Sequence, residues 1–137
     1  MNTRTAFFVI FLMLISFIVA RCNDPYFHQS EIEIPDNNWH MDKAATFKAE
    51  ITDTLNIYSI KFKIGHQADY RYSNLWLFIR TISPEKYAHI DTLEVFMAET
   101  DGKWIGNKNG SNYFIDFIYK KQVKFPKAGI YQFEIIQ

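Results

Sequence analysis

The chain has 137 residues, with 15 lysines and arginines, 15 aspartates and glutamates, and a single cysteine. This length allows one ordinary domain. The neutral charge balance argues against a nucleic-acid binder that acts through a basic surface, and the single cysteine excludes an internal disulfide framework and a cysteine-built zinc site.

The N-terminal region predicts a secretory signal segment. Residues 6–20 are apolar except for Ser16, and Arg4 precedes this run with no acidic residue nearby. A basic residue followed by an apolar run of this length is typical of a signal peptide, because a helix that crosses a bilayer needs about 20 apolar residues. A single N-terminal membrane helix is the alternative interpretation.

Cys22 directly follows this apolar run, at the position where bacterial lipoprotein signals end. In such proteins the cysteine becomes the first residue of the mature chain and carries acyl chains, and two or three chains anchor a protein far more firmly than one. Residues 19–22 (Val-Ala-Arg-Cys) resemble a lipobox, although Arg21 replaces the small residue expected there. We predict a lipoprotein signal peptide over residues 1–21 and lipidation of Cys22, with a free cysteine in a differently processed leader as the alternative.

The rest of the chain predicts a short tether over residues 22–30, which are mostly polar and contain Pro25, and one domain over residues 31–137. Residues 58–64 alternate between apolar and polar side chains, as in a half-buried strand. Residues 75–82 are nearly all apolar and suit a central strand buried on both faces. Further strand-like segments are residues 31–34, 46–51, 90–98, 113–119, 123–125 and 131–136.

About eight strands and no apolar stripe of helical period predict an all-β, immunoglobulin-like antiparallel β-sandwich, preceded by the signal and anchor segment. Tyr131 follows a turn that contains Pro126 and Gly129, which resembles a tyrosine corner. Immunoglobulin-like folds normally add another strand, whereas this sequence stops at Gln137. The domain would then lack a final strand, and the exposed edge of its last strand could accept a strand from a partner.

The residues contain no evident catalytic or metal-binding constellation. The four histidines (His28, His40, His66 and His89) have no metal-ligand spacing, so we interpret them as surface or loop residues. Nucleophile elbows, phosphate loops and zinc-protease motifs are missing from the sequence. The scattered carboxylates leave a glycosidase-type pair open, but nothing indicates one. We therefore predict neither an enzyme nor a metal or cofactor site.

Two loops are candidate binding surfaces. Residues 99–110 contain Asp-Gly and Asn-Gly pairs, which predict two turns around a hairpin-like loop. Trp104 at its centre either closes the end of the sandwich or projects as a contact residue. Tyr70, Arg71 and Tyr72 either form a protein-binding patch or pack on the strand ends. Together with Trp76, these residues are our candidates for partner binding.

The order of these motifs resembles the GldH family of gliding-motility lipoproteins. The resemblance includes the leader that ends at Cys22, Asn38-Trp39, residues 70–78 (Tyr-Arg-Tyr-Ser-Asn-Leu-Trp-Leu-Phe), residues 101–106 (Asp-Gly-Lys-Trp-Ile-Gly) and residues 123–131. It implies a non-enzymatic, membrane-anchored part of the gliding machinery, whose partners are other gliding and secretion proteins of the cell envelope. The leader leaves open whether the domain lies on the periplasmic or the outer-membrane side.

A carbohydrate-binding lipoprotein at the cell surface is the alternative function. Trp39, Trp104, Tyr70 and Tyr72 would then form a flat aromatic platform for sugar rings. This alternative requires at least two of the rings to lie coplanar and exposed on one face of the domain.

Overall fold

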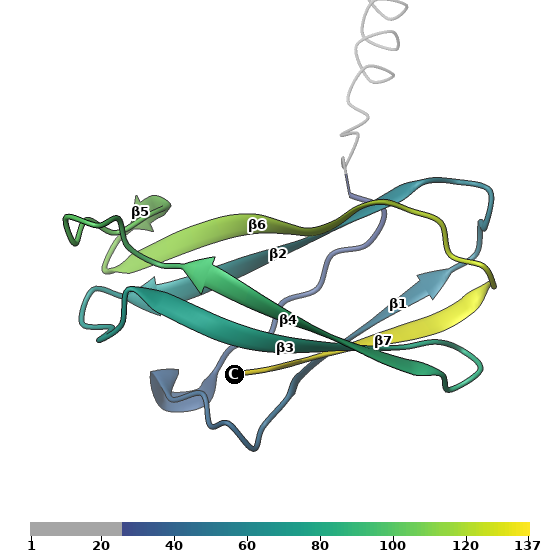
Figure 1. Ribbon diagram of the computed structural model, residues 1–137, viewed down its shortest axis with the longest axis horizontal. Helices are drawn as coiled ribbons and strands as arrows, with labels where there is room; N and C mark the ends of the chain where they lie inside the picture. Colours follow the sequence, from purple (N-terminus) through teal and green to yellow (C-terminus); the bar gives the residue numbers. More distant parts are fainter. Residues whose placement is uncertain (1–25) are drawn as a thin grey trace, which may run out of the picture.

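The computed structural model describes residues 26–137, so the predicted signal peptide and Cys22 lie outside the described residues. A short 3₁₀ turn, η1 (Pro35–Asn37), precedes seven strands (Figure 1). The strands are β1 (Ala45–Ile51), β2 (Tyr58–Gln67), β3 (Asn74–Ile82), β4 (Ala88–Phe96), β5 (Asn107–Asn109), β6 (Asn112–Val123) and β7 (Gly129–Ile136). Across residues 26–137, we find no helix with the length and apolar character needed to span a membrane.

The strands form two antiparallel sheets that face each other as two layers (Figure 1). Sheet A has the order β1-β7-β3-β4, and sheet B has the order β2-β6-β5. The predicted all-β sandwich is therefore confirmed. Its strand order differs from the ABED and CFG sheets of immunoglobulin constant domains, because the last strand of this chain lies inside sheet A.

The last strand lies between β1 and β3, and its residues 132–135 are paired on both sides. In β7, Phe133 pairs with Phe47 of β1, while Ile135 pairs with Ile79 of β3 on the other side. The expectation of an exposed edge on this strand is therefore wrong. The edge strands of sheet A are β1 and β4. In sheet B, most of β6 has a free edge on the side away from β2, because β5 pairs only with residues 112–114 of β6.

The predicted tyrosine corner is present. The Tyr131 hydroxyl donates a hydrogen bond to the Lys127 carbonyl oxygen at 3.0 Å, and its buried ring lies 4.5 Å from that of Phe125. Gly129 has a φ of +133°, and a Cβ atom there would lie 2.9 Å from the Pro84 ring. Only glycine fits this corner without strain.

The core lies between the sheets and follows the period-two pattern of the strands. Leu77, Ile79 and Met97 are the largest fully buried side chains. The predicted inward face of residues 58–64 is confirmed, because Ile60, Phe62 and Ile64 all pack against the buried clusters. Each fully buried side chain of this size stabilises the fold by about 1.5–3 kcal/mol.

Two predicted strand segments are not separate strands. Residues 31–34 form no ladder and lead into η1, where Pro35 has no N–H group to donate and a fixed φ. In the segment 123–125, Val123 is the last residue of β6, whereas Phe125 packs into a core cluster outside any strand.

Candidate functional site

An aromatic cluster closes one end of the sandwich. The Trp104 ring meets His66 edge-on at 4.6 Å, Tyr113 stacks on the same imidazole at 5.6 Å, and the Tyr70 ring also lies 5.6 Å from it. We call these four residues the end cluster. Trp104 is half-buried and packs against the main core. In this position Trp104 closes the end of the sandwich.

Local turn chemistry brings Trp104 to this position. The Gly102 N–H donates to the Glu99 carbonyl oxygen at 2.9 Å, and an Asp101 carboxylate oxygen accepts the Lys103 N–H at 3.0 Å. The chain then returns so that Trp104 forms a β-bridge with Ala98. A second turn at residues 110–111 joins β5 to β6. The two predicted turns are thus confirmed.

His66 is not the surface residue that we expected. It lies in β2 and is only 9% exposed. Its Nδ1 lies 2.8 Å from the Gln67 carbonyl oxygen, so Nδ1 carries the proton, while Nε2 has no hydrogen-bond partner among the described residues. The signal was available in the sequence: the alternation that turns Ile64 inward also turns His66 inward.

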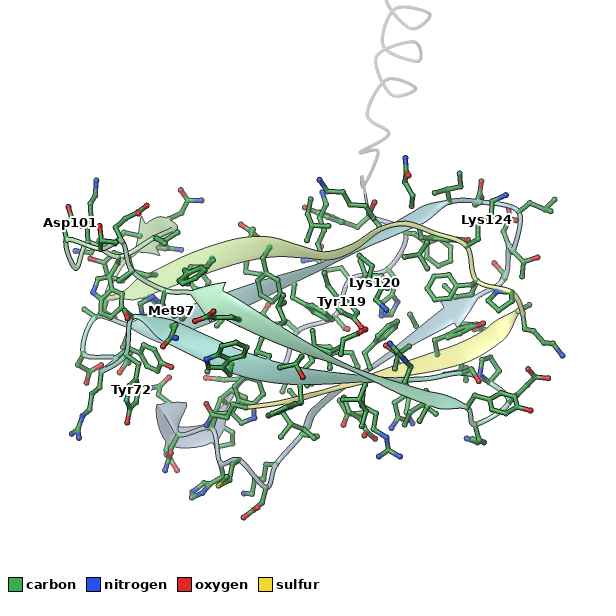
Figure 2. All side chains as sticks on the ribbon, viewed as in Figure 1. Tyr72, Met97, Asp101, Tyr119, Lys120 and Lys124 are labelled. Atoms are coloured by element: carbon green, nitrogen blue, oxygen red, sulfur yellow. The ribbon has the colours of Figure 1, made fainter. Side chains whose placement is uncertain are left out.

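The loop between β2 and β3 has one packed side chain, Tyr70, and two exposed ones, Arg71 and Tyr72. Tyr70 is half-buried in the end cluster, and its pKa is raised by burial and, to a smaller extent, by the neighbouring Tyr72. Tyr72 is 65% exposed, and Arg71 is exposed as well. Figure 2 shows Tyr72 at the end of the molecule. Arg71 and Tyr72 are therefore accessible to a partner, whereas Tyr70 supports the loop from within.

Trp76 belongs to a different surface, the outer side of sheet A. In β3, Leu77 and Ile79 point into the core, so Trp76 and Phe78 point outward. The expectation that this strand is buried on both faces is wrong, because none of the described residues forms a layer over the outer side of sheet A. A continuous apolar run has no period, and it cannot indicate which face remains open.

Neighbouring residues of β4 extend this exposed surface. Cross-strand pairing places Phe96 opposite Asn74 and Ile90 opposite Arg80, on the same side as Trp76 and Phe78. The four apolar side chains are Trp76 (52% exposed), Phe78 (45%), Ile90 (60%) and Phe96 (60%). We call them the outer apolar face.

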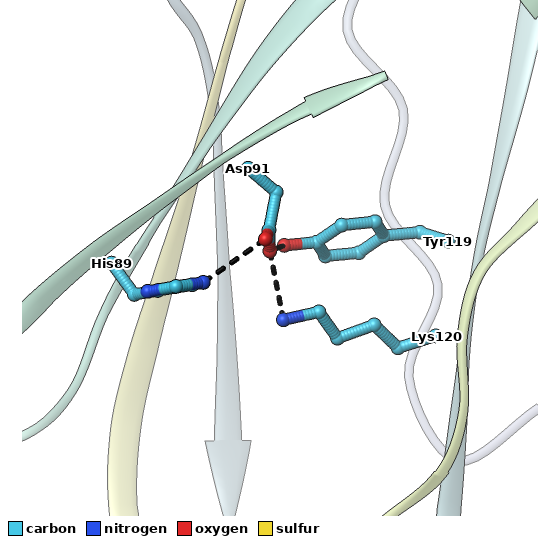
Figure 3. Close-up of polar contacts among 4 residues, drawn as sticks. All are labelled: His89, Asp91, Tyr119 and Lys120. Carbon is cyan, nitrogen blue, oxygen red and sulfur yellow. Dashed lines mark hydrogen bonds and ion pairs between the residues drawn. The ribbon is translucent and has the colours of Figure 1, made fainter. Parts of the chain in front are cut away.

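A polar cluster joins the two sheets where β4 and β6 have free edges (Figure 3). The Asp91 carboxylate of β4 accepts a hydrogen bond from the Tyr119 hydroxyl, and it pairs with Lys120 Nζ at 2.8 Å and with His89 Nε2 at 3.0 Å. Hydrogen bonding by Lys120 and then by Tyr119 lowers the pKa of Asp91 from 3.8 to about 2. We call this group the Asp91 clasp, and it links β4 to β6 directly.

The clasp also shifts the pKa values of Lys120 and Tyr119. The pKa of Lys120 is raised by its hydrogen bond to Asp91, and the pKa of Tyr119 is raised by burial and by the same carboxylate. Our sequence reasoning missed this cluster, because Asp91 and Tyr119 are 28 residues apart. Residues 26–137 contain no group of three or more His, Cys, Asp or Glu side chains able to hold a metal ion.

The aromatic rings do not form a flat sugar platform. The Tyr70 ring is tilted by 50° to Trp104 and by 70° to Tyr72. Among residues 26–137 no ring contact joins Trp39 to these three: it is half-buried and donates its indole N–H to the Lys43 carbonyl oxygen at 2.7 Å. The coplanar, exposed pair that the carbohydrate alternative requires is not found among these four residues.

Comparison with known proteins identifies the family. The model of the GldH lipoprotein family matches residues 26–137. A gliding motility lipoprotein GldH homolog of Christiangramia forsetii is 30% identical over 134 residues, which cover 98% of this chain and 82% of that relative. The gliding motility lipoprotein GldH of Flavobacterium johnsoniae is 31% identical over 99 residues, or 72% of this chain and 61% of that relative. No solved structure matches. The chain therefore belongs to the GldH family of gliding motility lipoproteins.

Proposed function

We propose that this chain is a non-enzymatic, lipid-anchored component of the gliding machinery, which acts through protein–protein contacts in the cell envelope. Cys22 carries the lipid in this proposal. Family membership supports the role in gliding and the attachment to a membrane. The partners are other gliding or secretion proteins of the envelope.

The outer apolar face is the observation that carries the proposal. Its four large side chains lie on two paired strands, each about half exposed or more. Soluble monomers rarely expose contiguous apolar patches of more than a few hundred Å², and larger patches mark sites of interaction. Aromatic residues are enriched at protein interfaces, and Trp is a frequent hot spot.

The β2–β3 loop extends this surface. Tyr72 lies two residues before Asn74, and Asn74 pairs with Phe96 at the end of the outer apolar face. Arg71 adds an exposed guanidinium, a group that is also enriched at interfaces. Arg71, Tyr72 and Trp76 therefore belong to one proposed docking surface, while Tyr70 and Trp104 hold its loop in place from within the end cluster.

Replacement of the aromatic side chains tests the docking proposal. We expect Trp76→Ala/Phe96→Ala to abolish or strongly reduce gliding in a strain that lacks its own copy of the protein. Both residues are exposed, so the thermal midpoint and the amount of protein in the membrane should change little. Ile130→Ala is the matched control: this residue is 56% exposed on the outer side of sheet A, but it lies in β7, away from the docking surface. Normal gliding by the double variant would refute the proposal.

The anchor is tested separately by metabolic labelling with a palmitate analogue. The wild-type chain should be labelled, and Cys22→Ala should not. Label that persists in the variant, or that is missing from both proteins, would contradict lipidation at Cys22.

A further inference from the structure

Lysines are concentrated on one layer of the sandwich. The strands of sheet B and the following residues 124–128 contain only one carboxylate, Asp116, but seven lysines: Lys61, Lys63, Lys108, Lys120, Lys121, Lys124 and Lys127. The remaining described residues carry six basic and thirteen acidic side chains. The near-neutral chain is therefore strongly polarised, with a positive sheet B and a negative remainder.

Part of this positive charge is not neutralised within the fold. Lys63 pairs with Asp116, Lys120 with Asp91, and Lys127 with Glu85.

Three further lysines, Lys61, Lys121 and Lys124, are exposed and form no ion pair among residues 26–137. They lie at one end of the β2–β6 ladder, where Tyr58 pairs with Val123. Lys121 comes two residues before Val123 and Lys124 directly follows it, while Lys61 comes three residues after Tyr58 in β2. We call these three residues the lysine face.

The described chain begins beside the lysine face. The Phe27 ring contacts Tyr58 edge-on at 5.3 Å, and Tyr58 in turn contacts Phe125 at 5.5 Å. Figure 1 shows this first segment on the sheet B side of the sandwich, and Figure 2 places Lys124 on the same side. The contact at Phe27 thus fixes where the N-terminal segment leaves the domain.

The distance from the lipid anchor to this point is short. Tyr26 is four residues after Cys22, and a fully extended chain spans at most about 3.5 Å per residue. A lipid on Cys22 would therefore keep Tyr26 within about 14 Å of the membrane surface. Tyr26 and Phe27 are both more than half exposed, and aromatic side chains suit the boundary between headgroups and acyl chains.

We propose that the lysine face rests on the membrane to which the chain is anchored and binds the phosphates of anionic phospholipids. This inference depends on the lipid anchor at Cys22 in the proposed function. Basic residues near an anionic bilayer each strengthen binding, so that loss of one lysine weakens it about fivefold. The carboxylates Glu31 and Glu33 precede η1, which contains Asp36 and lies on the sheet A side (Figure 1). Repulsion from the anionic surface therefore favours the same orientation.

The inference is tested by site-directed spin labelling of the full-length acylated chain in vesicles. Cys22 is the only cysteine, so acylation leaves an introduced cysteine as the sole free thiol. Ser59→Cys reports from the exposed side of β2, and Thr46→Cys reports from the exposed side of β1 in sheet A. Accessibility to a water-soluble paramagnetic relaxant is measured in phosphatidylcholine vesicles with and without about a third phosphatidylglycerol.

We expect the label at position 59 to be at least threefold less accessible than the label at position 46 in the anionic vesicles. This protection should disappear in pure phosphatidylcholine, in about 0.5 M salt, and in the variant Lys61→Gln/Lys121→Gln/Lys124→Gln. The matched control Lys48→Gln/Lys86→Gln/Lys103→Gln removes three exposed lysines from outside sheet B, with the same change in net charge, and should keep the protection.

The two proposals fail in different ways. If the acylated chain does not float with the vesicles, the anchor is wrong and the membrane orientation falls with it. If the chain floats but positions 59 and 46 are equally accessible, only the orientation is overturned. Loss of gliding in the lysine-face variant would then assign these lysines to an acidic protein partner instead of lipid.

Discussion

The Asp91 clasp makes a quantitative prediction about acid stability. The pKa of Asp91 is lowered from 3.8 to about 2 by Lys120 and Tyr119. At about 1.4 kcal/mol per pKa unit, the upper bound on its stabilisation is about 2.4 kcal/mol. Because the side chain is 32% exposed, solvent screening reduces our expectation to about 1 kcal/mol. A lowered carboxyl pKa stabilises the fold fully above the unfolded-state value, and this contribution is lost as the pH falls from about 3.8 to about 2.

Asp91→Asn tests this reasoning by urea unfolding at pH 7, 4, 3 and 2. The variant should be about 1 kcal/mol less stable than wild type at pH 7, and the difference should fall to about 0.2 kcal/mol at pH 2, where the folded-state carboxyl is about half protonated. Other carboxylates titrate equally in both proteins, so the difference isolates Asp91.

Asp116→Asn is the control, because its pair with Lys63 spans 3.5 Å and both side chains are 60% exposed. Its effect should stay below about 0.5 kcal/mol at every pH. A destabilisation by Asp91→Asn that is unchanged between pH 7 and pH 2 would refute the assignment of the stability to the ionised carboxylate.

Two further substitutions test the turns that shape the fold. Tyr131→Phe removes the hydrogen bond to the Lys127 carbonyl oxygen but keeps the buried ring. It should lower the free energy of unfolding by about 1 kcal/mol. An unchanged free energy of unfolding would show that the ring alone holds the corner. Gly106→Ala should cost more than about 2 kcal/mol, because Gly106 has a φ of +95° and a Cβ there would lie 2.2 Å from the Phe114 carbonyl oxygen. Thermal melts of Gly106→Ala and of Gly102→Ala, whose Cβ would meet open space, separate this clash from the general effect of a positive φ.

Where the sequence has a clear period, it predicts both the strand and its buried face. Residues 58–64 show this, because each polar position is flanked by apolar ones and only one face can enter a core. The tyrosine corner was predictable for a similar reason: a proline, a glycine and a following tyrosine are a local combination, and the Tyr131 hydrogen bond spans only four residues.

The candidate site depended on information that local patterns do not contain. Trp76 was identified as a partner-binding candidate, but its place on an open sheet face depends on which layers the whole chain can form. The Asp91 clasp depends on β4 and β6 facing each other across the sandwich, since only that arrangement brings Lys120 to Asp91. His66 was an error of a different kind, because the alternation through Ile64 already indicated its burial.

The proposed lysine face and the outer apolar face constrain each other. They lie on opposite layers of the sandwich, sheet B and sheet A. If Cys22 carries the lipid, Tyr26 lies within about 14 Å of the bilayer, and the contact of Phe27 with Tyr58 ties this end of the chain to sheet B. If the lysines rest on lipid, Trp76 and its neighbours point away from the membrane, where a large envelope protein can reach them. If instead sheet A lay on the membrane, its apolar side chains would insert into lipid, and the docking variants would lose membrane contact rather than a protein partner. The accessibility of position 46 therefore decides which class of partner the outer apolar face can meet.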